Sequence, residues 1–83
     1  MMDQDNGMKE LLSAMVEKLV DHPEAIQINQ ISSDQAYIFE LQVDKTDVGK
    51  VIGRGGKTAS ALRTLLEAAA GKLKKRIILE ILE

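Results

Sequence analysis

The residues best suited by type and spacing to form a binding or reactive site lie in the segment 50–57, which reads Lys-Val-Ile-Gly-Arg-Gly-Gly-Lys. It combines glycines, which permit positive φ angles and close backbone approach to a ligand, with basic side chains. The glycines are Gly53, Gly55 and Gly56, and the basic residues are Lys50, Arg54 and Lys57. A helix predicted to follow this segment would aim its N-terminal amides at the same place. Amides and cations together attract anions, so the segment predicts a phosphate-binding loop.

Two nucleotide-binding motifs are excluded by their spacing. Gly56-Lys57-Thr58 matches the end of a P-loop, but that motif requires a glycine at position 51, where this chain has Val51. The dinucleotide-binding pattern G-x-G-x-x-G also fails, because Thr58 occupies the place of its last glycine. Nucleotide hydrolysis and dinucleotide chemistry are therefore not expected.

The composition argues against an enzyme. The chain has no cysteine, so it can form no disulfide, thiolate zinc site or cysteine nucleophile. It has one histidine, His22, which gives a histidine-based metal site or catalytic triad almost no ligands or partners. The carboxylates cluster away from the basic half of the chain. We therefore predict a binding protein with no cofactor, no metal and no small-molecule substrate.

Charge is divided unevenly along the chain, although the net charge is only −2. Residues 1–47 contain three Lys or Arg against ten Asp or Glu, and residues 48–83 contain eight against three. The C-terminal half thus carries the local positive charge that phosphate binding needs, which an acidic isoelectric point can hide.

The apolar pattern predicts six elements around the glycine loop. In chain order they are a helix over 8–20 that stops before His22-Pro23, strands near 26–28 and 37–43 with a turn at 32–35, a helix over 48–52 behind a Thr46-Asp47 cap, a helix over 59–70, and a strand over 76–82. This α-β-β-α-α-β order predicts an α+β fold. Its three-stranded mixed sheet pairs the first two strands antiparallel, returns the last strand parallel to the second and carries all helices on one face. Residues 1–7 are predicted to be a flexible N-terminus, and 8–83 one domain.

Val51-Ile52-Gly53-Arg54-Gly55-Gly56-Lys57 resembles the V-I-G-x-x-G core of KH domains, which bind RNA. The element order resembles the type II, prokaryotic KH domain. The chain length and the segment 47–57 resemble most closely the KhpA family of small stand-alone bacterial KH proteins. This resemblance implies a groove for about four nucleotides of single-stranded RNA, with the paired glycines letting the RNA backbone approach.

The resemblance also implies roles for individual residues. Gly53 and Gly56 match the fixed glycines, Arg54 and Gly55 the variable pair, and Ile52 the apolar floor of the groove. The last strand is expected to form the opposite wall, with the basic loop 72–75 as its rim, beside the glycine loop. The predicted RNA-binding set is Lys50, Ile52, Gly53, Arg54, Gly55, Gly56, Lys57, Lys72, Lys74, Lys75 and Arg76.

Members of the family are expected to act as RNA chaperones or post-transcriptional regulators, and to pair with the KH protein KhpB (also called Jag) or with themselves. Control of cell-wall synthesis, peptidoglycan homeostasis, cell shape and elongation is what the resemblance implies. The acidic N-terminus does not resemble a signal peptide and no segment is long enough to span a membrane, so a cytoplasmic location is expected. Tyr37 and Phe39, the only aromatic residues, are assigned to the core. A protein-interaction module whose glycine loop is an interface remains the alternative.

Overall fold

The computed structural model of the protein describes residues 7–83, apart from the side chain of Lys72. Apart from Gly7, the N-terminus predicted to be flexible lies outside this range. The helices are α1 (Met8–Glu17), α2 (Val48–Ile52) and α3 (Lys57–Ala69), and the strands are β1 (Gln27–Ser32), β2 (Ala36–Gln42) and β3 (Arg76–Ile81). Short 3₁₀ turns occupy Pro23–Ala25, Lys45–Asp47, Arg54–Gly56 and Gly71–Leu73. The predicted α-β-β-α-α-β order is confirmed.

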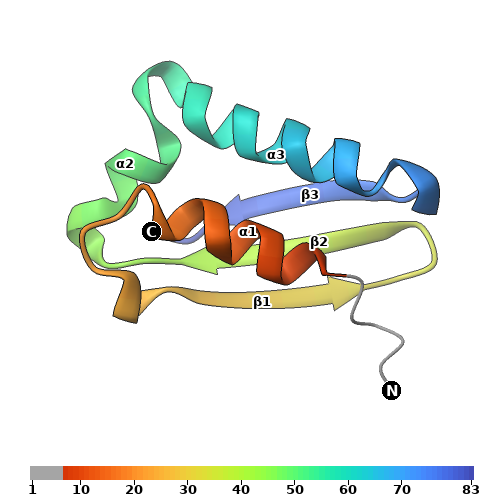
Figure 1. The fold of residues 1–83 in the computed structure, drawn as a ribbon, viewed down its shortest axis with the longest axis horizontal. Helices are drawn as coiled ribbons and strands as arrows, with labels where there is room; N and C mark the ends of the chain where they lie inside the picture. Colours follow the sequence, from red (N-terminus) through yellow and green to blue (C-terminus); the bar gives the residue numbers. More distant parts are fainter. Residues whose placement is uncertain (1–6) are drawn as a thin grey trace.

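The three strands form one mixed sheet in the order β1-β2-β3. β1 pairs antiparallel with β2, with Ile31 opposite Ile38, and β3 pairs parallel with β2, with Ile78 opposite Ile38. A parallel pair needs a long crossover connection, and the segment containing α2 and α3 provides it. All three helices lie on the same side of the sheet (Figure 1).

The core lies between this helical layer and the sheet. Alternation along β2 buries Tyr37, Phe39 and Leu41 toward the helices, so the prediction that both aromatic residues are core residues is confirmed. The buried apolar side chains are Met8, Leu12, Val16, Val20, Tyr37, Phe39, Leu41, Val43, Val51, Leu62, Leu66, Ala70 and Ile77. Fully burying a side chain of this size contributes about 1.5–3 kcal/mol, so this layer is what holds α2 and α3, and the loop between them, against the sheet.

Among the described residues, no helix covers the other face of the sheet. Pairing places Ile31, Ile38 and Ile78 in one row across this face, with Glu40 and Glu80 side by side two residues further along β2 and β3. With both aromatic residues on the core side and two acidic side chains here, the open face lacks the stacking platform that sheet-type RNA binders use.

Two element boundaries differ from the prediction. α1 ends at Glu17 rather than Val20, because the amides of Lys18 and Leu19 bond to carbonyls three residues back instead of four. The chain then closes in a tight turn that still buries Val20, so the apolar spacing outlasts the helix. Ser32, predicted to belong to the hairpin turn, is the last residue of β1.

Candidate functional site

Gly53 joins α2 to the glycine loop in a conformation open only to glycine. Its φ of 78° and ψ of 171° lie in a region essentially restricted to glycine. A Cβ atom here would also collide with Thr58, lying 2.7 Å from its Cβ and 2.8 Å from its backbone nitrogen. The sharp turn at Gly53 therefore requires glycine for two reasons: its backbone angles, and the lack of space for a Cβ beside Thr58.

Gly55 and Gly56 complete the loop with left-handed backbone angles, φ 63° and 78°. The amide of Gly56 donates to the carbonyl of Gly53 over 3.1 Å, which closes the turn. No atom lies within 4 Å of a Cβ placed at either residue, so this side of the loop is open. Gly56 is also the residue before α3, and no side chain caps that helix start. The first amides of α3 are thus available to an anion approaching the loop.

Arg54 and Lys57 supply the charge at this open side. Both side chains are exposed, and within residues 7–83 neither forms an ion pair. Two unneutralised cations beside the positive end of a 13-residue helix form an anion-binding surface. Val51 is fully buried, whereas Ile52 is only partly buried where α2 meets the loop. The predicted residues 52–57 therefore do lie together.

Lys50 differs from these cations because it is already paired. Its Nζ atom lies 3.2 Å from a carboxylate oxygen of Asp21 and 3.3 Å from one of Asp47. These hydrogen bonds, with Asp21 first, raise the pKa of Lys50. Lys50 points to the turn after α1 in the free protein. Its predicted contact with RNA would have to compete with two carboxylates.

Asp47 was predicted to cap α2 but has another role. Its side chain is completely buried and accepts hydrogen bonds from the backbone amide of His22 at 3.0 Å and from the His22 ring at 3.2 Å. The local cap is Asp44, which accepts from the amide and hydroxyl of Thr46 at 2.9 and 2.8 Å. Asp47 thus ties the start of α2, and through it the glycine loop, to the segment after α1.

This contact shifts both acid–base equilibria. Burial alone would raise the pKa of Asp47, but hydrogen bonds from the Asp21 and His22 backbone, the His22 ring and Lys50 hold it below its usual value. The hydrogen bond to Asp47 raises the pKa of His22, assisted by the negative charges of Asp44 and Glu24. Both pKa shifts favour the ionised pair, imidazolium beside carboxylate, over the neutral one.

The basic segment after α3 does not lie where we predicted. Lys74, Lys75 and Arg76 lie at the C-terminal end of α3, beside the β1–β2 turn, whereas the glycine loop lies at its N-terminal end (Figure 1). A 13-residue helix separates the two ends by about 20 Å at 1.5 Å per residue. The segment cannot be the rim of a groove beside the glycine loop, although its contact with RNA stays a prediction. Lys72 belongs to the same loop, but its side chain lies outside the described part.

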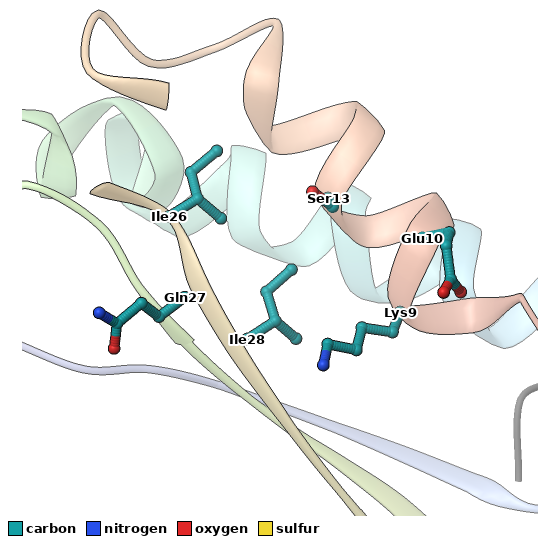
Figure 2. A pocket seen from close by; sticks show the side chains of 6 residues that line it. All are labelled: Lys9, Glu10, Ser13, Ile26, Gln27 and Ile28. Carbon is teal, nitrogen blue, oxygen red and sulfur yellow. The ribbon is translucent and has the colours of Figure 1, made fainter. Parts of the chain in front are cut away.

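A pocket lies elsewhere, between α1 and the start of β1. It has a volume of about 490 Å³. Figure 2 shows Ile28 of β1 and Ile26, the residue before β1, on one side of the pocket and Lys9, Glu10 and Ser13 of α1 on the other. It has no aromatic or catalytic side chain and no connection with the glycine loop. In the described part of the chain, no group of His, Cys, Asp or Glu could hold a metal ion. No helix within 7–83 is long and apolar enough to cross a membrane.

Sequence analysis did not identify three residues that pack against α2 or the glycine loop, namely Asp21, His22 and Thr58. Asp21 and His22 contact the start of α2 from far away in the sequence, and no local pattern connects them to Asp47. Thr58 was noted only as a mismatch to nucleotide-binding motifs, yet its side chain and backbone nitrogen lie so close to Gly53 that no Cβ fits there. The length of the predicted helix over 59–70 did carry one usable signal, because it already separates the basic segment from the loop.

Comparison with known proteins gives a consistent result. Residues 9–81 match the family model described as "KhpA/KhpB, KH domain". The "RNA-binding protein KhpA" of Caldanaerobacter subterraneus subsp. tengcongensis is 49% identical over 90% of this chain and 100% of its own length. The proteins of the same name from Clostridium acetobutylicum and Aquifex aeolicus are 44% and 38% identical, over 90% and 94% of this chain and 100% and 99% of their own lengths. No solved structure gives a significant match. The family resemblance noted in the sequence is therefore confirmed, and the chain belongs to the KhpA/KhpB family of KH domains.

Proposed function

We propose that this protein binds single-stranded RNA by holding its phosphate backbone against the glycine loop. The observation that carries this proposal is the open loop itself: Gly55 and Gly56 leave its outer side free, Arg54 and Lys57 are unpaired within residues 7–83, and the start of α3 is uncapped. Backbone amides and cations recognise phosphates without reading bases. The relatives carry the name "RNA-binding protein", which supports RNA as the source of those phosphates.

Family membership also bears on the reaction class. The KH domain is a binding module, so the chain is not an enzyme. We expect modest affinity, micromolar or weaker, because the loop offers few contacts and association carries an entropic cost. A tetranucleotide has about three linking phosphates, which predicts a slope near −2 for log K against log salt.

The decisive variant is Arg54→Asp combined with Gly55→Asp, which changes the local charge by −3. Asp tolerates the left-handed conformation of Gly55 better than most residues, and extra negative charge at the start of α3 favours the helix. We expect the circular dichroism spectrum and melting temperature to change little. RNA affinity should fall about tenfold or more, equivalent to about 1.4 kcal/mol.

A matched control is Lys18→Asp combined with Gln42→Asp, which changes the charge by the same amount at two exposed positions away from the loop. Screening at physiological salt limits the reach of such charges to about 8 Å, so the control should bind RNA nearly as well as the wild type. Equal losses in both variants would mean that net charge, rather than the loop, governs binding. Unchanged binding in the loop variant would contradict the proposal.

The biological role is proposed from family resemblance. We infer that the protein acts in the cytoplasm as an RNA chaperone or post-transcriptional regulator, together with a KhpB-like KH protein, in the control of cell-wall synthesis and cell elongation. Pulldown of a KhpB-like protein and sequencing of RNA crosslinked in cells test the two halves of this proposal separately.

One observation favours a second function as an interaction module. Leu65, on the outer face of α3, is 52% exposed, the largest value among the exposed large apolar side chains within residues 7–83. We propose that this face supports a homodimer or a heterodimer with a second KH protein, which would place two glycine loops on one RNA and raise the apparent affinity. Sedimentation over a concentration series tests self-association.

A further inference from the structure

The cations that follow α3 form a separate group at the opposite end of the molecule from the glycine loop. We define the basic end as Lys74, Lys75 and Arg76. Arg76 begins β3 on the open face of the sheet, in line with Ile78, whereas Lys75 lies against Tyr37. Their backbone is fixed to the hairpin, since the amide of Arg76 donates to the carbonyl of Gln35 over 3.0 Å. Within residues 7–83, none of the three side chains forms an ion pair. The contacted turn contains one acidic residue, Asp34, so the three cations leave an excess of positive charge at this end.

Two features show that the basic end is a formed surface rather than a loose loop. The Lys75 ammonium donates to the carbonyl of Ser33 over 2.6 Å and lies 4.8 Å from the centre of the Tyr37 ring. It is therefore held in place while keeping its charge. Lys74 is the only non-glycine residue with positive φ within residues 7–83, at 56°. Such a conformation is costly and persists where the surrounding structure enforces it, often at functional positions.

The charges along α3, which separates the glycine loop from the basic end, do not repel a polyanion. α3 carries two cations, Lys57 and Arg63, and one acid, Glu67, whose carboxylate lies 3.8 Å from Arg63. A strand held at the glycine loop would have to cover about 20 Å along α3 to reach the basic end. At about 3.4 Å per nucleotide, the rise of a strand in a stacked duplex, about six nucleotides cover that distance, and an extended single strand covers it with fewer. Four nucleotides clamped at the glycine loop end before the basic end.

We propose that the basic end is a second phosphate-binding surface, which contacts the same RNA strand only when that strand extends beyond the four nucleotides at the glycine loop. This rests on the proposed function of the loop. The contact adds affinity without reading bases, because the second binding event becomes intramolecular. The protein therefore distinguishes long single strands from short ones.

The test compares a uridine tetramer with a uridine dodecamer on the wild type and on Lys74→Asn combined with Arg76→Gln. Asparagine accepts positive φ, and Lys75 is kept because it contacts Ser33 and Tyr37. The variant should bind the tetramer like the wild type and the dodecamer about tenfold more weakly. Its salt slope for the dodecamer should be shallower by about 1.4, for two lost contacts. Comparing variant with wild type on one oligonucleotide removes the statistical advantage of longer RNA.

The control variant is Lys9→Gln combined with Lys18→Gln, which removes two exposed cations from α1 and the turn after it. It should leave the affinity for both oligonucleotides within about twofold. Arg76→Gln alone should weaken dodecamer binding about threefold, and it serves as the second variant if the Asn substitution disturbs the fold.

The outcomes separate the two proposals. If the wild type binds neither oligonucleotide, the proposed function itself fails. If the wild type binds both but the basic-end variant matches it on both, the second surface is wrong and the loop proposal stands. Equal weakening for tetramer and dodecamer would also overturn the inference, because it would place the basic end in the same short site as the loop.

Discussion

The Nζ atom of Lys50 lies 3.2 Å from the carboxylate of Asp21, a residue from the turn that follows α1. This pair joins the first helix–strand connection to α2 at a point three residues before Gly53. In the free protein it neutralises a cation that would otherwise add to the charge of the glycine loop. Any phosphate that reaches Lys50 must displace Asp21 or share the ammonium group with it.

Asp21→Asn should therefore strengthen RNA binding. Removal of the exposed carboxylate leaves Lys50 with Asp47 alone and frees ammonium protons for phosphate. We expect about a two- to threefold gain in affinity and a salt slope steeper by up to about 0.7. Fluorescence anisotropy with a short RNA at several salt concentrations measures both. Glu10→Gln, an equal charge change on exposed α1, is the control; a similar gain there would show that Lys50 is not involved.

Stability should depend on pH through His22 and Asp47. The raised pKa of His22 means that its contribution is complete below its ordinary pKa of 6.5 and is lost as pH rises through the folded-state value. The lowered pKa of Asp47 has the opposite sense, with stabilisation present above 3.8 and lost as pH falls. The melting temperature should therefore be higher at pH 6 than at pH 8.

His22→Gln provides the comparison for this pH effect. Glutamine cannot titrate, so the difference in melting temperature between pH 6 and pH 8 should largely disappear. Differential scanning calorimetry at both pH values measures it. If the variant keeps the wild-type difference, the contact between His22 and Asp47 is not its source.

Gly53→Ala should damage the fold more than Gly56→Ala. Both substitutions place a side chain at positive φ, but only at Gly53 does the new Cβ meet Thr58. We expect a loss of about 2–3 kcal/mol in the free energy of unfolding for Gly53→Ala and about 1–2 kcal/mol for Gly56→Ala. Chemical denaturation followed by circular dichroism gives both values. Equal losses would show that the approach of Thr58 is not a constraint.

Leu65→Lys should weaken self-association and leave short-RNA binding intact. The side chain is exposed on α3, so the substitution costs the monomer little, while a charge in a buried apolar contact is expensive. Ile31→Lys, on the open face of the sheet and 44% exposed, is the matched control. Sedimentation velocity of both variants identifies the contact face. Loss of association only in the Ile31 variant would show that the interface is the open face of the sheet and not α3.

Most of the fold follows from local patterns in the sequence. Alternation at Tyr37, Phe39 and Leu41 predicts a half-buried strand, and the three glycines within 53–56 predict the break between α2 and α3. The end of α1 was missed because Leu19 and Val20 keep helical spacing inside a tight turn. Apolar spacing records which side chains are buried, and it does not record whether the amides bond three or four residues back.

The candidate site was predictable where its parts are contiguous. The glycine loop, Arg54 and Lys57 come from one stretch of sequence and lie together. The contact between His22 and Asp47 joins residues 25 positions apart, and only tertiary structure brings them together. The basic end was misplaced because its charge, rather than its position at the far end of α3, guided the prediction.

The contact between Lys75 and Tyr37 has a spectroscopic consequence. The chain contains one tyrosine and no tryptophan, so its intrinsic near-ultraviolet fluorescence comes from a ring that lies 4.8 Å from that ammonium group. If an RNA phosphate draws Lys75 away, the surroundings of this fluorophore change, whereas a ligand at the glycine loop, beyond the other end of α3, should leave them undisturbed. We therefore expect tyrosine emission to respond to occupancy of the basic end without any label.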